Sequence, residues 1–103
     1  MMPQEDQPLL VAQDGPLKGQ RWQLGKPIVL GREPSCDVVI TDRQISRFHA
    51  RLTPTTEGVI LEDLGSKNGT LLNELPLSRP TSIEPGDIIG IGDLRLVLEA
   101  GAE

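Results

Sequence analysis

The chain has 103 residues, of which 37% are hydrophobic, and this suits one folded domain with one core. Its net charge is −5, its aromatic residues are Trp22 and Phe48, and no apolar run is long enough for a membrane span, so we expect neither a nucleic acid nor a membrane as partner. One cysteine and one histidine exclude an internal disulfide and a Cys/His zinc site, and a single cysteine fits the cytoplasm.

From Leu9 onward, short apolar runs alternate with turn residues at intervals of about 8–12 residues, the pattern of a β-sandwich. The expected strands are 9–13, 20–24, 28–30, 38–40, 48–53, 59–64, 70–72, 75–77, 88–91 and a last strand through residues 94–98. The run 48–53 alternates, which places Phe48 and Ala50 on one face and His49 on the other. Nine prolines and eleven glycines interrupt the chain too often for long helices. We therefore predict an all-β fold, a β-sandwich of about eleven short strands with binding loops clustered at one end.

The domain boundaries follow from the polar ends of the chain. We expect a disordered tail at 1–7, one sandwich domain at 8–99 and a C-terminal tail at 100–103. Residues 1–15 and 84–103 together carry a charge of −7, which leaves +2 for residues 16–83. An anion site in the middle of the chain is therefore compatible with the negative net charge, because a local field can differ from it in sign.

Three polar clusters fall on turns between the expected strands. They are Gly31-Arg32, then Ser46-Arg47-Phe48-His49, and then Gly65-Ser66-Lys67-Asn68-Gly69-Thr70 with Asn73 beyond it. Taken singly, each is explained by turn geometry, since glycine suits tight turns and close backbone approach. Together they bring arginine, which binds phosphate through paired hydrogen bonds, next to serine, lysine and asparagine donors with almost no acid. This combination favours a phosphate dianion over a metal ion.

The same residues do not assemble an enzyme. Ser46 and His49 would lie on opposite faces if both were on an extended strand, and the chain has no second histidine. Residues 65–70 miss the phosphate-loop pattern of nucleotide hydrolases, because Lys67 precedes the second glycine. We therefore predict no catalytic activity, no cofactor and no metal.

In their order and spacing, the clusters resemble the forkhead-associated (FHA) domain, and residues 83–92 resemble the penultimate turn and strand of that family. The similarity runs from about Leu9 to Leu98. The resemblance implies a β-sandwich whose loops bind phosphothreonine in a partner protein. It also implies that the domain is a binding module in Ser/Thr kinase signalling. It implies that Arg32 and Ser46 bind the phosphate, that Arg47 adds charge or a peptide contact, and that Asn68 holds the peptide backbone. Structural support of the site would come from Gly31, His49, Gly65, Gly69, Thr70 and Asn73.

Lys67 departs from the family pattern, because many members have a small hydroxyl residue there. Lysine can bind phosphate as a point charge, and Ser66 is another source of the hydroxyl contact. Arg43 and Gln44 resemble the region that senses the third residue after phosphothreonine, where Gln44 implies a polar or weak preference and Arg43 an acidic one. Lys67 also leaves open a phosphate-independent interaction scaffold, which the retention of Arg32 disfavours. Because both ends of the chain are polar, we expect this domain to be part of a larger multidomain protein.

Overall fold

The computed structural model describes residues 7–101, so most of the two predicted tails, residues 1–6 and 102–103, lies outside the described residues. It contains eleven strands. They are β1 (Leu9–Ala12), β2 (Arg21–Gln23), β3 (Ile28–Gly31), β4 (Val38–Val39), β5 (Ala50–Thr55), β6 (Gly58–Asp63), β7 (Leu71–Leu72), β8 (Leu75–Pro76), β9 (Thr81–Ile83), β10 (Ile88–Ile91) and β11 (Leu94–Glu99). A short 3-10 helix, Gly15–Leu17, lies between β1 and β2. Over residues 7–101 there is no helix of the length and apolarity that a membrane span requires.

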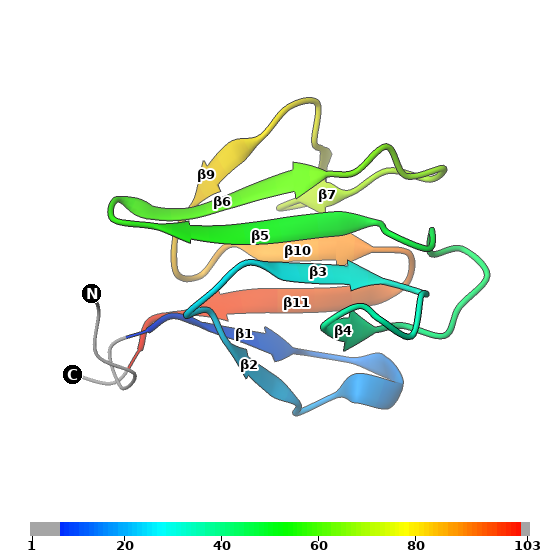
Figure 1. The fold of residues 1–103 in the computed structure, drawn as a ribbon, viewed down its shortest axis with the longest axis horizontal. Coiled ribbons are helices and arrows are strands. Elements are labelled where there is room, and N and C mark those ends of the chain that lie inside the picture. Colours follow the sequence, from blue (N-terminus) through cyan, green and yellow to red (C-terminus); the bar gives the residue numbers. More distant parts are fainter. Residues whose placement is uncertain (1–6, 102–103) are drawn as a thin grey trace.

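The strands form two sheets that pack against each other (Figure 1). The six-stranded sheet has the order β2-β1-β11-β10-β7-β8 and the five-stranded sheet the order β4-β3-β5-β6-β9. Neighbouring strands are antiparallel except β3 and β4, which run parallel. The prediction of an all-β sandwich is confirmed.

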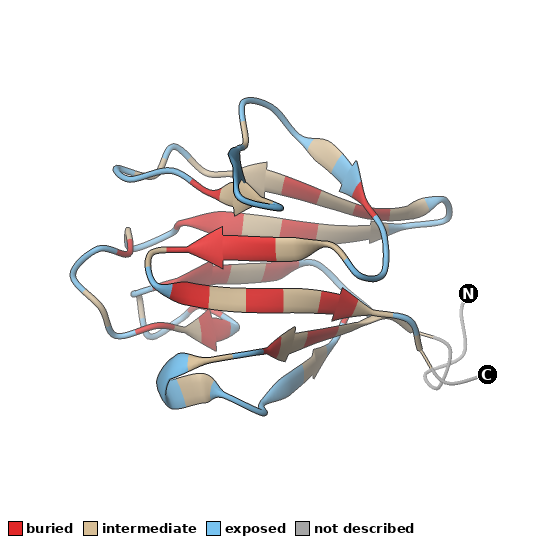
Figure 2. Ribbon diagram, turned by 180° about the vertical axis from the view of Figure 1, so that it is seen from behind, coloured by how far each residue is buried: buried red, intermediate tan, exposed pale blue. Residues whose placement is uncertain are grey.

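Alternation along the strands places aliphatic side chains between the two sheets. In β11 the side chains of Leu94, Leu96 and Leu98 are buried, while the residues between them are partly exposed. Figure 2 shows this alternation of buried and intermediate residues along the strands. Burying one such side chain fully contributes about 1.5–3 kcal/mol, so the core gives the loops a rigid support.

Two local features differ from the sequence-based expectation. β9 is missing from the expected strands because Ile83 is its only large apolar residue, and its pairing with β6 is what makes it a strand. The expected faces of Phe48 and His49 are wrong, since Phe48 is 50% exposed and His49 is fully buried. β5 begins only at Ala50, and the residues before it are a bend in a loop, to which the two-residue period of a strand does not apply.

The loops that carry the three polar clusters lie at the same end of the sandwich. The β3–β4, β4–β5 and β6–β7 connections emerge at the right of Figure 1, and the β5–β6 hairpin lies at the left. The sheets therefore bring together Arg32, Ser46 and Asn68, which are far apart in the sequence.

Candidate functional site

Arg32 directly follows β3, and its guanidinium is oriented by the β4–β5 loop. Its backbone N–H donates to the carbonyl oxygen of Ser46 at 3.0 Å, and its Nε–H donates to the carbonyl oxygen of Ile45 at 3.1 Å. The residue is exposed, and neither Nη group has a protein partner among residues 7–101. Both Nη groups therefore remain available as a planar pair of donors, the arrangement that binds phosphate oxygens.

Gly31 allows β3 to approach the turn that contains Arg47. A Cβ atom at Gly31 would lie 2.1 Å from the carbonyl oxygen of Arg47, which is far inside contact distance. The same carbonyl accepts hydrogen bonds from the backbone N–H of Glu33 at 3.1 Å and from Sγ of Cys36 at 3.3 Å. Burial raises the pKa of the Cys36 thiol, with the charges of Glu33 and Asp37 adding to the effect, so the thiol stays protonated as this donor.

Ser46 links the second cluster to the third. Its Oγ accepts a hydrogen bond from the backbone N–H of Lys67 at 2.9 Å. This bond occupies a lone pair and leaves the hydroxyl hydrogen free to donate, and no residue in the described part of the chain accepts it. Ser46 thus presents a free hydroxyl donor beside Arg32, whose backbone N–H is bonded to the carbonyl of Ser46.

His49 lies behind these loops and joins them. The backbone N–H of Ser46 donates to its Nδ1 at 3.1 Å, so Nδ1 is the acceptor and Nε2 carries the hydrogen. Nε2 then donates to the carbonyl oxygen of Gly69 at 2.8 Å. The ring contacts the backbone of Ser46 and makes no hydrogen bond with its Oγ, so the two residues do not form a nucleophile–base pair.

Asn68 reaches from the β6–β7 loop to the β4–β5 loop. Its Nδ2 donates to the carbonyl oxygen of Gln44 at 2.9 Å. The side chain is exposed, so its carbonyl oxygen stays accessible to a peptide N–H. The structure therefore sets Asn68 beside Gln44 and Arg43, the two residues expected to sense flanking peptide positions, and both are exposed.

Asp63 at the end of β6 organises the β6–β7 loop, a role that was not predicted from the sequence. Its Oδ2 accepts the backbone N–H groups of Gly65 and Ser66 at 3.0 and 2.8 Å. Its Oδ1 accepts the hydroxyls of Ser66 and Thr70 at 2.6 and 2.7 Å. The Asp-x-x-Ser spacing is the sequence signal for this arrangement, because short acidic side chains often cap the turn that follows them.

The hydrogen bonds to Asp63 also shift its titration. Partial burial alone would raise the pKa, but the hydroxyl hydrogen bonds from Ser66 and Thr70 outweigh it, and the pKa of Asp63 lies below its ordinary value of 3.8. A carboxylate with a lowered folded-state pKa contributes stability that is present above pH 3.8 and is lost as the pH falls through the folded-state pKa.

We predict that Asp63→Asn lowers the free energy of unfolding at pH 7 by about 1.5–3 kcal/mol, because hydrogen bonds to a charged group are lost. Urea unfolding between pH 7 and pH 3 should show that the variant loses less stability on acidification than the wild type. Glu57→Gln, at an exposed position in the β5–β6 hairpin, removes one carboxylate away from the site and serves as the control. The same acid dependence in wild type and Asp63→Asn would contradict the assigned role.

Ser66, expected to contact the phosphopeptide, uses its hydroxyl within the loop. Its O–H donates to Asp63, and its Oγ accepts the backbone N–H of Gly69 at 2.9 Å. A phosphate oxygen needs a donor, and the single O–H of Ser66 is already donated. Lys67, by contrast, has an exposed side chain with no protein partner among residues 7–101, so it is the residue of this pair that can reach an anion.

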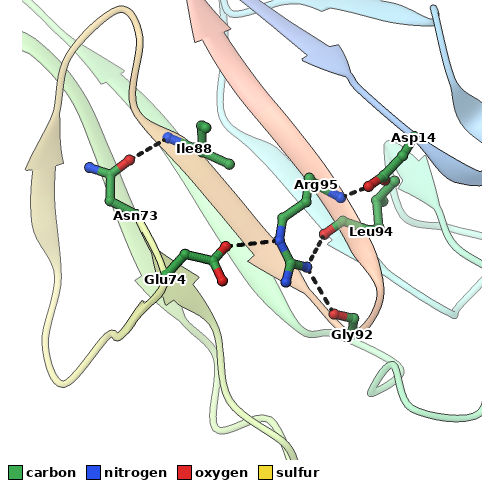
Figure 3. Close-up of polar contacts among 7 residues, drawn as sticks. All are labelled: Asp14, Asn73, Glu74, Ile88, Gly92, Leu94 and Arg95. Carbon is green, nitrogen blue, oxygen red and sulfur yellow. Dashed lines mark hydrogen bonds and ion pairs between the residues drawn. The ribbon is translucent and has the colours of Figure 1, made fainter.

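The remaining glycines and Asn73 shape the turns. Gly65 and Gly69 have φ values of 78° and 84°, which glycine adopts without strain. Asn73 and Glu74 also have positive φ, as in the tight hairpin turn expected between β7 and β8. Asn73 Oδ1 accepts the backbone N–H of Ile88 at 2.9 Å, which joins this hairpin to the start of β10 (Figure 3).

The loop end carries four exposed cations that are free of ion pairs. They are Arg32, Arg43, Arg47 and Lys67. Within the described residues, the ion pairs join Arg51 to Glu62 and Arg95 to Glu74, on the strands and the β7–β8 hairpin. Both carboxylate oxygens of Asp63 accept hydrogen bonds from donors of its own loop. The site therefore combines free hydrogen-bond donors with exposed positive charge at one end of a β-sandwich, which are the features of an anion-binding module.

Comparison with known proteins agrees with this class. The profile of the FHA domain matches residues 28–92. The oxoglutarate dehydrogenase inhibitor of Corynebacterium glutamicum is 38% identical over 94 residues, which cover 90% of this chain and 65% of that protein. The glycogen accumulation regulator GarA of Mycobacterium tuberculosis is 36% identical over 94 residues, which cover 90% of this chain and 57% of that protein. The chain thus spans about half to two thirds of the length of the curated relatives it matches.

A solved structure from an analysis of phosphothreonine-dependent FHA domain interactions has a TM-score of 0.84 and 26% identity, over 94% of this chain and 99% of that one. The match to the sequence profile and the similarity to the curated relatives together establish the family of this chain. The chain belongs to the FHA domain family.

Proposed function

We infer that this chain is a phosphothreonine-dependent protein-binding module that reads a phosphorylated segment of a partner in Ser/Thr kinase signalling. The observation that carries the inference is the pair of unengaged donors at the loop end. The guanidinium of Arg32 is held in place through Nε, and Oγ of Ser46 is held in place by the backbone N–H of Lys67, which leaves its hydroxyl hydrogen free to donate. The similarity to the solved structure from an analysis of phosphothreonine-dependent FHA domain interactions supports the same function.

The roles divide by geometry. Arg32 and Ser46 bind the phosphate, and Asn68 holds the peptide backbone next to it. Lys67 and Arg47 supply exposed positive charge at the edge of the site. Ser66 belongs with the supporting residues, together with Asp63, Thr70 and His49, because its hydroxyl is bonded within the loop.

The alternative of a phosphate-independent scaffold has weaker support. A scaffold would have no need for a guanidinium oriented by Ile45 and left unpaired at its two Nη groups. A catalytic role is also disfavoured, because His49 bonds to the backbone of Ser46 and to Gly69 and has no nitrogen left to activate a nucleophile. We therefore propose a cytoplasmic, non-catalytic reader. Its place in a larger multidomain protein stays a prediction.

The expected affinity is micromolar. Charge-assisted hydrogen bonds contribute about 1.5–3 kcal/mol each. Four such bonds give on the order of 6–12 kcal/mol before the ordering of the peptide is subtracted, which costs several kcal/mol. The balance corresponds to a Kd of about 1 μM, or about −8 kcal/mol.

The affinity should fall as the pH drops from 7 to 5. The second pKa of a phosphothreonine is about 6, so its dianion is replaced by the monoanion over this range while arginine stays charged. We expect about tenfold weaker binding at pH 5 by isothermal titration calorimetry, in proportion to the lost dianion. Circular dichroism at pH 5 is the control that the domain remains folded. Constant affinity from pH 7 to pH 5 would count against a dianion ligand.

A further inference from the structure

A cavity of about 130 Å³ lies beside the loops of the phosphate site and has no role in the site described above. Its walls are the 3-10 helix, the chain just after β4, and the turn between β10 and β11. Leu17, Ile40 and Leu94 give it apolar walls. Small-molecule sites enclose about 300–1,000 Å³, so a cavity of this size suits a single side chain better than a metabolite.

Two carboxylates stand among these walls. Asp42 is partly exposed and uses Oδ1 to accept the backbone N–H of Gln44 at 2.9 Å, while Asp93 is exposed and makes no side-chain bond within the described residues. Among residues 7–101, neither carboxylate is in an ion pair. Arg43, the cation next in the chain, is not part of the cavity lining. Apolar walls with an acidic rim complement a long basic side chain, which has an apolar stem and a charged head.

The walls are held in place before any ligand arrives. The backbone N–H of Arg95 donates to Oδ1 of Asp14 at 2.8 Å, next to the 3-10 helix. The side-chain Nη1 of Arg95 donates to the carbonyl oxygens of Gly92 and Leu94 at 3.1 and 3.3 Å, in the β10–β11 turn (Figure 3). One arginine therefore fixes two of the three walls. A Cβ at Gly92 would lie 2.9 Å from Cδ1 of Ile45, so this turn also packs closely on the β4–β5 loop.

The cavity and the phosphate site share the β4–β5 loop. Only Arg43 separates Asp42 in the cavity from Gln44, whose carbonyl oxygen holds Asn68. The residue that would hold the peptide backbone is therefore bonded to the same loop that lines the cavity. We propose that the cavity is a second subsite that takes an arginine or lysine side chain of the phosphorylated partner segment. This inference rests on the proposed function. It adds to the preferred peptide sequence a basic residue at a fixed spacing from the phosphothreonine.

The test is calorimetry with phosphothreonine peptides in which one arginine is moved position by position through an otherwise neutral segment. Citrulline, which has the shape of arginine without its charge, and leucine replace it at each position. At one position the arginine peptide should bind about two- to fivefold more tightly than the citrulline peptide, the range of a partly exposed ion pair.

The double variant Asp42→Asn with Asp93→Asn should lose this preference and bind the citrulline peptide as the wild type does. Asparagine at position 42 keeps an oxygen for the N–H of Gln44. The matched control, Glu57→Gln with Glu84→Gln, removes the same charge at exposed positions outside the cavity and should keep the preference.

The outcomes separate this inference from the proposed function. Equal binding of arginine and citrulline at every position, or leucine binding as tightly as arginine, would overturn the second subsite while phosphothreonine dependence remains. Equal binding of phosphorylated and unphosphorylated peptides would overturn the proposed function, and the subsite with it.

Discussion

Replacing Arg32 by alanine should weaken binding of a phosphothreonine peptide by at least about 100-fold, because two charge-assisted hydrogen bonds of about 1.5–3 kcal/mol each are lost. The side chain is exposed and lies outside the core, so the free energy of unfolding should change by less than about 1 kcal/mol. Calorimetry for binding and urea unfolding for stability measure the two effects on the same protein.

Arg32→Lys and Arg21→Ala make this prediction specific. Lysine keeps the charge but lacks both the Nε–H that donates to Ile45 and the planar pair of Nη donors, so most of the affinity should still be lost. Arg21 is exposed on β2, and Arg21→Ala removes the same charge away from the site with little expected effect. Normal binding by Arg32→Ala would show that the phosphate is held elsewhere.

Replacing His49 by alanine should instead destabilise the fold, by about 3–5 kcal/mol in urea unfolding. The ring is fully buried, and its loss leaves a cavity and removes the partners of the Ser46 N–H and the Gly69 carbonyl. Since small domains are stable by about 5–15 kcal/mol, this is a large share of the total.

His49→Asn keeps the prediction measurable if the alanine variant fails to fold. Its Oδ1 can still accept the N–H of Ser46, so only the bond to Gly69 is lost and the effect should be smaller, about 1–3 kcal/mol. Phe48→Ala, next in the chain but 50% exposed, should change stability by less than about 1 kcal/mol. Equal effects at positions 48 and 49 would argue against His49 as the residue that joins the loops.

The sandwich class and most of the strands could be predicted from the sequence because they follow from local patterns. The alternation at Leu94, Leu96 and Leu98 shows which face is buried, and the turn between β7 and β8 is marked by Asn73, a residue type that tolerates positive φ. The arrangement within the loops depends on contacts between distant segments. His49 is buried because it bonds to Ser46 and Gly69, which no period in the sequence reveals.

The different roles of Ser66 and Lys67 also could not be predicted from the sequence. From sequence, either could contact the phosphate. We propose Lys67 as the anion contact, because Asp63 accepts the hydroxyl of Ser66 while Lys67 is exposed. The role of Asp63 can be predicted from the Asp-x-x-Ser spacing in the sequence. The cavity near Asp93 cannot be predicted in this way, since the walls of the cavity come from three separate parts of the chain.

The central claim is that this domain recognises phosphothreonine, and one measurement tests it most directly. A peptide selected from a degenerate phosphothreonine library is titrated into the domain in its phosphothreonine, phosphoserine and unphosphorylated forms. We predict a Kd of about 1 μM for phosphothreonine, weaker binding of phosphoserine, and no measurable binding of the unphosphorylated peptide. Equal affinity for all three forms would contradict the function proposed for Arg32, Ser46 and Asn68.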